Sequence, residues 1–158
     1  MATSTTNSFS SSPWHAAYPA PTSTPTLIRR EEVLKMMKQN TDSSRRDFVL
    51  VDLRRNDYEG GTIRGAINLP AQSLYPTIPT LYHLFKDAGR RKIIWYCSSS
   101  KGRGTRAAGW FADHVANQGD AQMESLVLLD GVKGWATAGD EYVQSMIAYD
   151  ASVWSAKQ

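Results

Sequence analysis

Short apolar runs alternate with amphipathic stretches along most of the chain. Three of these runs are rich in β-branched and aromatic residues: "DFVLVDL" (47–53), "KIIWY" (92–96) and "SLVLL" (125–129). Their near-continuous hydrophobicity is typical of strands that are covered on both faces. The pattern therefore predicts that these runs form the centre of a sheet.

Stretches with helical periodicity separate the predicted strands. They are "LIRREEVLKMMKQN" (27–40), "TLYHLFKDA" (80–88) and "TRAAGWFADHVANQ" (105–118). The apolar faces that the first and last would bury are Val33, Leu34 and Met37, and Ala107, Phe111 and Val115, respectively. Gly119 is placed to end the last helix. Strands that alternate with helices imply βαβ units, so we expect an α/β fold with a central parallel sheet flanked by helices.

Composition and charge narrow the class of protein. With 158 residues, 41% hydrophobic and 21% charged, the chain is large enough for one soluble domain with a core. A single cysteine excludes an intramolecular disulfide, so a cytoplasmic or nuclear location, or both, is expected. The net charge of +3 is spread over scattered basic pairs, which makes nucleic acid an unlikely partner. No apolar run reaches the roughly 20 residues of a membrane span.

The first 26 residues are rich in Ser, Thr and Pro and contain no charged side chain. Such a segment buries too little apolar surface to offset the entropy of ordering it, so residues 1–26 are predicted to be a flexible tail. A mitochondrial transit peptide is the alternative, but such peptides are rich in Arg and the first Arg here is Arg29. Residues 27–158 are then the folded catalytic domain.

The candidate chemistry lies in "IIWYCSSSKGRGTRAAGWFADHV" (93–115), where Cys97 follows a predicted strand. In parallel sheets, ligands bind beyond the carboxyl ends of the strands, where the next helix begins. The residues that would form an anion-binding loop there are Ser98, Ser99, Ser100, Lys101, Gly102 and Arg103. Backbone N–H groups, the helix N-terminus and the cations would favour the thiolate of Cys97, and Arg103 has the fork that holds a tetrahedral oxyanion.

A lone cysteine that ends a buried strand is most often a small hydrophobe, and an Arg six places after it is a weak signal by itself. The order of strand, cysteine, small-residue loop, Arg and amphipathic helix is more specific, and it favours a nucleophile at the floor of the anion site.

Two further segments carry a family resemblance. "LVDLRRNDYEGGTIRGAINLP" (50–70) resembles the segment that precedes the active site in rhodanese-fold proteins, and "LLDGVKGWATAG" (128–139) resembles their Gly-Gly-x-x-Gly-Trp signature. With the Cys97 loop between them, the resemblance covers roughly residues 27 to 140. It implies a single rhodanese-like domain.

The spacing from Cys97 to Arg103 is similar to that of the cell-cycle dual-specificity phosphatases and the fungal arsenate reductases, whereas sulfurtransferases have a shorter loop. The resemblance implies that Cys97 is the nucleophile, Arg103 the anion clamp and Arg106 a supporting cation. The expected activity is that of a cysteine phosphatase of the tyrosine or dual-specificity type, active on aryl phosphates, or of an arsenate reductase, or both. The substrate would be a small oxyanion or a phosphorylated protein.

Neither chemistry requires a bound cofactor or a metal, but arsenate reduction would require glutathione or glutaredoxin as an external reductant because no second cysteine exists. Two alternatives stay open: a sulfurtransferase that carries a Cys97 persulfide, and a non-catalytic rhodanese-like module that binds a phosphorylated partner.

The chain also departs from the family pattern. Tyr96 and Thr62 stand where relatives have His, and Asp130 replaces the first Gly of the terminal signature. The Cys97 loop contains no carboxylate, so no general acid can be assigned. Asp57 or Glu59 would reach the mouth of the site only if the segment after the strand at 47–53 folds over it.

Other polar and aromatic residues have plainer expected roles. Asp52 and Arg54 are expected to form a structural pair. His83 and His114 are expected to take no part in catalysis. The tryptophans at 95, 110 and 135 are expected to pack in the core.

Overall fold

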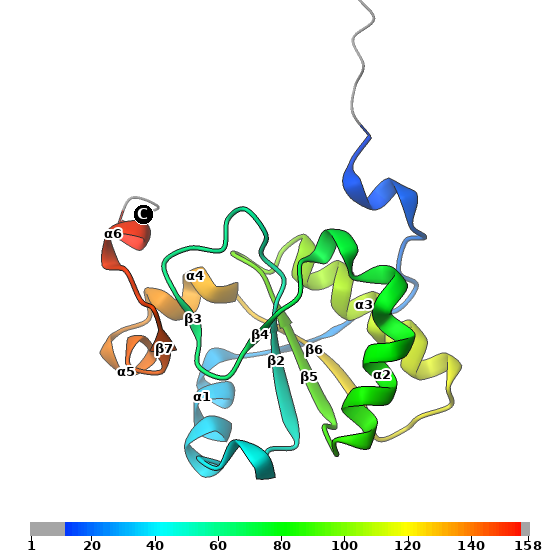
Figure 1. Cartoon of the computed structure of the whole chain (residues 1–158), viewed down its shortest axis with the longest axis horizontal. Coiled ribbons are helices and arrows are strands. Elements are labelled where there is room, and N and C mark those ends of the chain that lie inside the picture. The colour runs from blue at the N-terminus through cyan, green and yellow to red at the C-terminus, as the bar shows by residue number, and fades with distance from the viewer. Residues whose placement is uncertain (1–11, 156–158) are drawn as a thin grey trace, which may run out of the picture.

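The computed structural model describes residues 12–155 of the chain. Its central sheet has five parallel strands in the order β1-β6-β5-β2-β4 (Figure 1). The strands are β1 (Thr26–Ile28), β2 (Phe48–Asp52), β4 (Ile67–Asn68), β5 (Lys92–Tyr96) and β6 (Glu124–Leu128). Strands β3 (Thr62–Ile63) and β7 (Met146–Ile147) form a separate antiparallel pair.

Helices cover both faces of the sheet. They are α1 (Arg30–Gln39), α2 (Ile78–Asp87), α3 (Arg103–Asn117), α4 (Gly131–Ala136), α5 (Asp140–Val143) and α6 (Ala151–Ser155). Short 3-10 turns lie at η1 (Trp14–Ala17), η2 (Ser43–Arg45), η3 (Ala71–Ser73) and η4 (Tyr75–Thr77). In Figure 1, α2 and α3 lie to the right of the sheet, whereas α1, α4 and α5 lie to its left. No helix within residues 12–155 is long and apolar enough to cross a bilayer.

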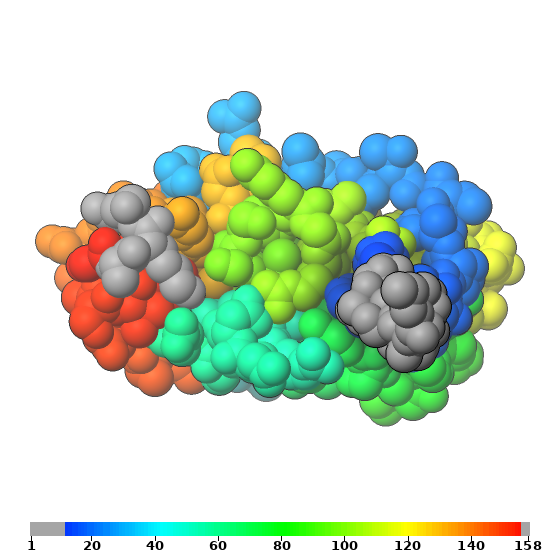
Figure 2. Space-filling view, turned by 90° about the horizontal axis from the view of Figure 1, so that it is seen from above, coloured from blue at the N-terminus to red at the C-terminus, as the bar shows by residue number. Residues whose placement is uncertain are grey.

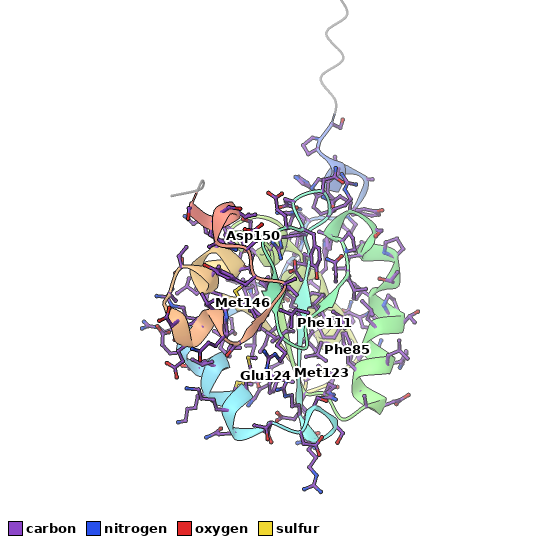
Figure 3. All side chains as sticks on the ribbon, turned by 60° about the vertical axis from the view of Figure 1, so that its left-hand side comes forward. Phe85, Phe111, Met123, Glu124, Met146 and Asp150 are labelled. Atoms are coloured by element: carbon purple, nitrogen blue, oxygen red, sulfur yellow. The ribbon has the colours of Figure 1, made fainter. Side chains whose placement is uncertain are left out.

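The core is divided into two layers by the sheet. Figure 3 shows Phe85, Phe111 and Met123 on the side of α2, and Met146 on the opposite side. Side chains of β5 and of the residue that follows it alternate between these layers: Trp95 and Cys97 belong to the layer under α3, and Tyr96 belongs to the other. Because side chains alternate along a strand, the Cys97 thiol points toward α3, the helix that follows.

The predicted α/β fold is confirmed. The three apolar runs form β2, β5 and β6, and the three periodic stretches coincide with most of α1, α2 and α3. Helices α2 and α3 each begin two residues before the predicted stretch. All of the residues predicted for the apolar faces of α1 and α3 are buried. Gly119 lies just after α3 with φ +65°, as a residue that ends a helix in the left-handed region should. The first two residues of the stretch at 27–40 belong instead to β1, an edge strand that pairs with β6.

The prediction of a flexible tail over residues 1–26 is wrong for the part that the structure describes; residues 1–11 lie outside it. Residues 13–25, here called the N-terminal strap, lie against α3. The indole Nε1 of Trp110 donates to the carbonyl oxygen of Pro19 at 2.8 Å. Asp113 accepts hydrogen bonds from the backbone N–H of Thr22 and of Ser23, each at 2.8 Å.

The strap packs on α3 because a few of its residues make specific contacts that its average composition does not predict. The rings of Trp14 and Tyr18 lie edge-on to the ring of Trp110, with centroids 6.0 and 5.8 Å away. Prolines restrict the unfolded strap, which lowers the entropy lost on docking. Gly109 leaves room for it, since a Cβ there would lie 2.7 Å from the Cβ of Pro21.

Candidate active site

Cys97 lies immediately after β5, with only 3% of its surface exposed. The chain then turns back over the sulfur, because Ser100 adopts the left-handed region with φ +62°. That turn brings the backbone N–H of Ser100 to 3.2 Å from the Sγ of Cys97, and the Ser100 hydroxyl to 3.4 Å from the Cys97 N–H. The Ser100 N–H is therefore turned inward, toward the sulfur.

The loop is held from below by the segment that begins α4. The N–H of Val132 donates to the carbonyl oxygen of Cys97 at 3.1 Å, and the N–H of Lys133 donates to that of Ser98 at 3.0 Å. Gly131 permits this approach, since a Cβ there would lie 2.5 Å from the Ser98 oxygen. Asp130, which stands where the family has Gly, adopts φ +67°, a region that Asp tolerates better than most residues.

Arg103 begins α3 and lies beside Cys97, and its guanidinium is held by a carboxylate. Its Nη1 and Nη2 donate to the two side-chain oxygens of Asp57 at 2.8 and 2.5 Å. These bonds, together with the charge of Cys97 and a hydrogen bond to it, raise the pKa of Arg103 although burial opposes the shift. The same pair lowers the pKa of Asp57 to about 2. The segment after β2 thus folds over the mouth of the site.

Arg54 is the reason that this segment folds over. Its guanidinium is 1% exposed and pairs with the Asp52 carboxylate at 2.8 Å. Its remaining N–H groups donate to the carbonyl oxygens of Glu59 at 2.8 Å and Gly61 at 2.7 Å. The pair expected from the sequence is therefore present and buried. It anchors the backbone that carries Asp57.

The two residues that replace His in the family pattern contact each other. The Thr62 hydroxyl lies 2.7 Å from both the Asp52 carboxylate and the Tyr96 hydroxyl. A carboxylate only accepts, so Thr62 donates to Asp52 and Tyr96 donates to Thr62. Burial and the charge of Asp52 raise the pKa of Tyr96, which keeps the phenol neutral. Tyr96 points away from Cys97, into the other layer of the core.

The other predicted site residues occupy the loop and the first turn of α3. Ser99, Lys101 and Gly102 are exposed, and Ser98 is half-buried. Figure 2 shows the loop near residue 100, in light green, between the teal segment near residue 60 and the orange segment that begins α4.

Arg106 lies one turn into α3 and is half-buried. Its side chain has no hydrogen bond or ion pair within the part of the chain that the structure describes, so its supporting role stays a prediction.

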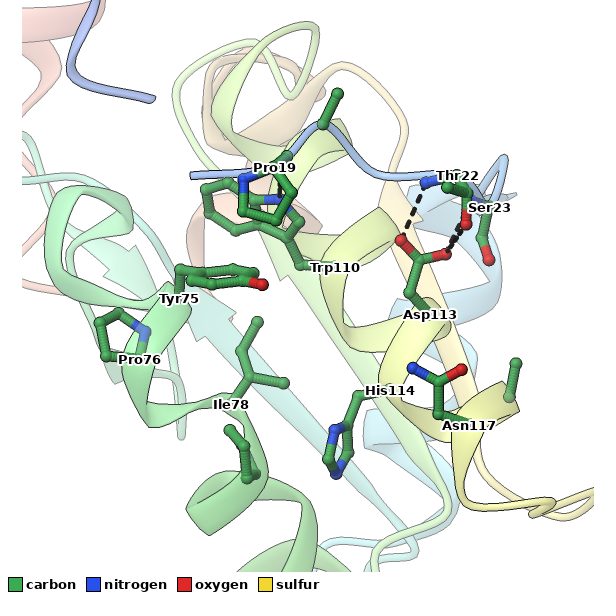
Figure 4. Close-up of a pocket in the computed structure, with 13 residues that line it drawn as sticks. Pro19, Thr22, Ser23, Tyr75, Pro76, Ile78, Trp110, Asp113, His114 and Asn117 are labelled. Carbon is green, nitrogen blue, oxygen red and sulfur yellow. Dashed lines mark hydrogen bonds between the residues drawn. The ribbon is translucent and has the colours of Figure 1, made fainter. Parts of the chain in front are cut away.

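The tryptophans and histidines for which the sequence predicts no catalytic role lie outside the Cys97 loop. The three tryptophans are buried as predicted. His83 lies on α2 and His114 on the far half of α3. His114 lines a pocket of about 660 Å³ between the N-terminal strap and α2, with Trp110 and Tyr75 on its walls (Figure 4). None of the residues that line this pocket belongs to the Cys97 loop.

The thiol lies at the carboxyl end of a central parallel strand, and a loop and an Arg on the next helix follow it. This arrangement is consistent with the family that the sequence matches. The model of the Rhodanese-like domain matches residues 30–138. The chain belongs to this family. The matched region includes the whole site, from Arg54 to the start of α4.

Several relatives of the rhodanese-like chain are known. Arsenical-resistance protein 2 of Saccharomyces cerevisiae is 29% identical over 110 residues, which cover 65% of this chain and 85% of that protein. The solved structure of Ygr203w, described as a yeast protein tyrosine phosphatase of the Rhodanese family, is 25% identical with a TM-score of 0.67, over 84% of this chain and 98% of that one. The As-Sb reductase from Leishmania major shares the fold, with a TM-score of 0.59 at 21% identity over 68% and 72% of the two chains.

Proposed function

We propose that this rhodanese-like protein is a thiol-dependent arsenate reductase in which Cys97 attacks the oxyanion. The observation that carries the proposal is the geometry around the sulfur: the Ser100 N–H lies 3.2 Å from Sγ, and Arg103 lies beside it on the next helix. A nucleophile with an anion-binding Arg beside it is what a covalent reaction on a tetrahedral oxyanion requires. The similarity to Arsenical-resistance protein 2 supports arsenate as the substrate.

In the proposed reaction, the Cys97 thiolate forms a bond to arsenic and one arsenate oxygen leaves as water after protonation. Arg103 and the loop N–H groups stabilise the charge on the remaining oxygens. Cys97 is the only cysteine, so no second thiol of the chain can complete the reduction. External thiols such as glutathione and glutaredoxin would supply the two electrons: overall, arsenate and two thiols give arsenite, a disulfide and water.

Hydrolysis of aryl phosphates is the second candidate activity. It is favoured by the similarity to the yeast tyrosine phosphatase, which extends over 98% of that chain. The Cys97 loop carries no carboxylate that could protonate a leaving group. Aryl phosphates have weakly basic leaving groups, so they depend least on such an acid, and alkyl phosphates should react slowly.

A parallel assay of wild type and Cys97→Ser separates these activities. The substrates are arsenate with glutathione and glutaredoxin, an aryl phosphate, and thiosulfate with cyanide. The proposal predicts turnover of arsenate that is lost in Cys97→Ser. Turnover of the aryl phosphate alone would indicate that the chain is a phosphatase and not a reductase. Turnover of thiosulfate alone would indicate a sulfurtransferase, and a chain inactive on all three would be a binding module.

A further inference from the structure

The guanidinium that should hold the oxyanion already holds a carboxylate. Both terminal nitrogens of Arg103 donate to Asp57, one to each side-chain oxygen, at 2.8 and 2.5 Å. A parallel pair of N–H donors is also the arrangement that binds two oxygens of a phosphate-like anion. Arg103 has other N–H groups, but the two that Asp57 holds are not available to an anion that binds across both terminal nitrogens.

We propose that Asp57 is an internal competitor for the oxyanion: a tetrahedral anion must displace its carboxylate before it can bind both terminal nitrogens of Arg103 above Cys97. The inference rests on the proposed function, since it concerns the same site. The inference assigns Asp57 a role in specificity, because Asp57 sets how strongly an anion must interact with Arg103 to enter the site.

The surroundings of Asp57 fit a side chain that can leave while its backbone stays. The Asp57 side chain is 37% exposed, whereas that of Arg103 is 22% exposed. The backbone next to it is tied down, since Arg54 donates to the carbonyl oxygen of Glu59 at 2.8 Å. A rotation about the Asp57 side-chain bonds therefore places the carboxylate in water without repacking the core.

Charge decides which anions can displace Asp57. The carboxylate is ionised at neutral pH, since Arg103 holds its pKa near 2. A singly charged anion replaces it without a gain in Coulomb energy, whereas a doubly charged oxyanion interacts more strongly with Arg103 and the loop N–H groups. Asp57 should thus select dianionic tetrahedral species over chloride and simple carboxylates.

A positioning role for Asp57 would predict the opposite change in anion affinity. If Asp57 served to hold Arg103 in its working position, removing the carboxylate would loosen Arg103 and weaken anion binding. If Asp57 competes, removing it frees the fork and removes a nearby negative charge. Both effects strengthen anion binding.

The test is the binding of sulfate, a tetrahedral dianion that neither titrates near neutral pH nor turns over. Its dissociation constant can be measured by the protection of Cys97 from iodoacetamide in the full-length chain. Asp57→Asn should bind sulfate about tenfold more tightly than wild type, the size expected for release of one partly exposed charge-assisted pair. Asp57→Ser should do the same, and Asp57→Glu, which keeps the charge, should stay near wild type.

Asp42→Asn is the matched control, because Asp42 is an exposed carboxylate paired with Arg45 far along the chain from the loop. It should leave the sulfate affinity unchanged. Unchanged or weaker sulfate binding in both Asp57→Asn and Asp57→Ser would overturn the competitor role. The readout does not depend on turnover, so tighter binding in a chain that reduces no arsenate would uphold the competitor role while the proposed function failed.

Discussion

The hydroxyl groups of Thr62 and Tyr96 lie 2.7 Å apart, although the two residues are 34 positions apart in the sequence. Both stand where related sequences have His, so the two departures from the family pattern meet at one point of the core. Together with Asp52 and Arg54 they form a buried polar chain beneath the segment that carries Asp57. The two hydroxyl groups are thus part of the polar network that anchors that segment.

This pairing predicts unequal effects of two substitutions. Thr62→Val should lower the free energy of unfolding by about 2–3 kcal/mol, because it leaves the Tyr96 hydroxyl without an acceptor and removes a donor to Asp52. Tyr96→Phe should cost only about 1 kcal/mol, since Thr62 still donates to Asp52. Urea unfolding of both single variants and the double variant measures this. Additive effects in the cycle would contradict the contact.

Gly131 should be indispensable to the Cys97 loop. A Cβ at this position would lie 2.5 Å from the Ser98 carbonyl oxygen and 2.6 Å from that of Cys97. Gly131→Ala should therefore displace the loop, lower stability by about 3 kcal/mol and abolish turnover. Thermal unfolding and the arsenate assay measure both effects.

Gly119 provides the matched control for Gly131. Its φ of +65° is close to the +60° of Gly131, but a Cβ on Gly119 meets nothing within 4 Å. Gly119→Ala should cost only the backbone strain, about 1 kcal/mol, and keep full activity. Equal losses of stability in the two variants would mean that backbone strain, and not the contact with the loop, determines the effect of Gly131→Ala.

Asp113 should hold the N-terminal strap on α3. Burial alone would raise its pKa, but hydrogen bonds from Ser23 and Thr22 outweigh burial and lower it. Asp113→Ala should release residues 20–25, speed proteolysis of the strap and lower the free energy of unfolding by about 1 kcal/mol. Limited proteolysis followed by mass spectrometry detects the cuts. Asp87→Ala, at an exposed site on α2, should leave the digestion pattern of wild type.

The ion pair of Asp57 should make stability depend on acid pH. The folded-state pKa of Asp57 is about 2, below its ordinary value of 3.8. Its contribution is therefore fully present above about pH 4 and is lost as the pH falls through 2. Asp57→Asn should be less stable than wild type by about 1 kcal/mol at neutral pH, after allowance for solvent screening. The gap should close toward pH 2. A gap that is constant with pH in urea unfolding would contradict the ion pair.

The position of Cys97 could be predicted because local pattern determines it. Near-continuous hydrophobicity identified β5, the period of α3 identified the following helix, and the end of a parallel strand is a fixed place for a ligand.

The carboxylate on Arg103 could not be predicted, because the direction of the segment after β2 depends on hydrogen bonds from Arg54 to backbone carbonyl oxygens. Such contacts leave no periodicity in the sequence. The N-terminal strap was missed for a related reason: a composition average over 26 residues hides two aromatic side chains and the carboxylate on α3 that receives the strap.

The central claim is that Cys97 and Arg103 act together on an oxyanion, and arsenite production by substituted chains tests it most directly. Cys97→Ser should produce none, and Arg103→Lys should be slower than wild type by about a hundredfold or more, because a point charge cannot replace the fork. Arg45→Lys, an exposed control on η2, should match wild type. Loss in Cys97→Ser together with wild-type rates in Arg103→Lys would contradict the claim, because the thiol would then act without the clamp.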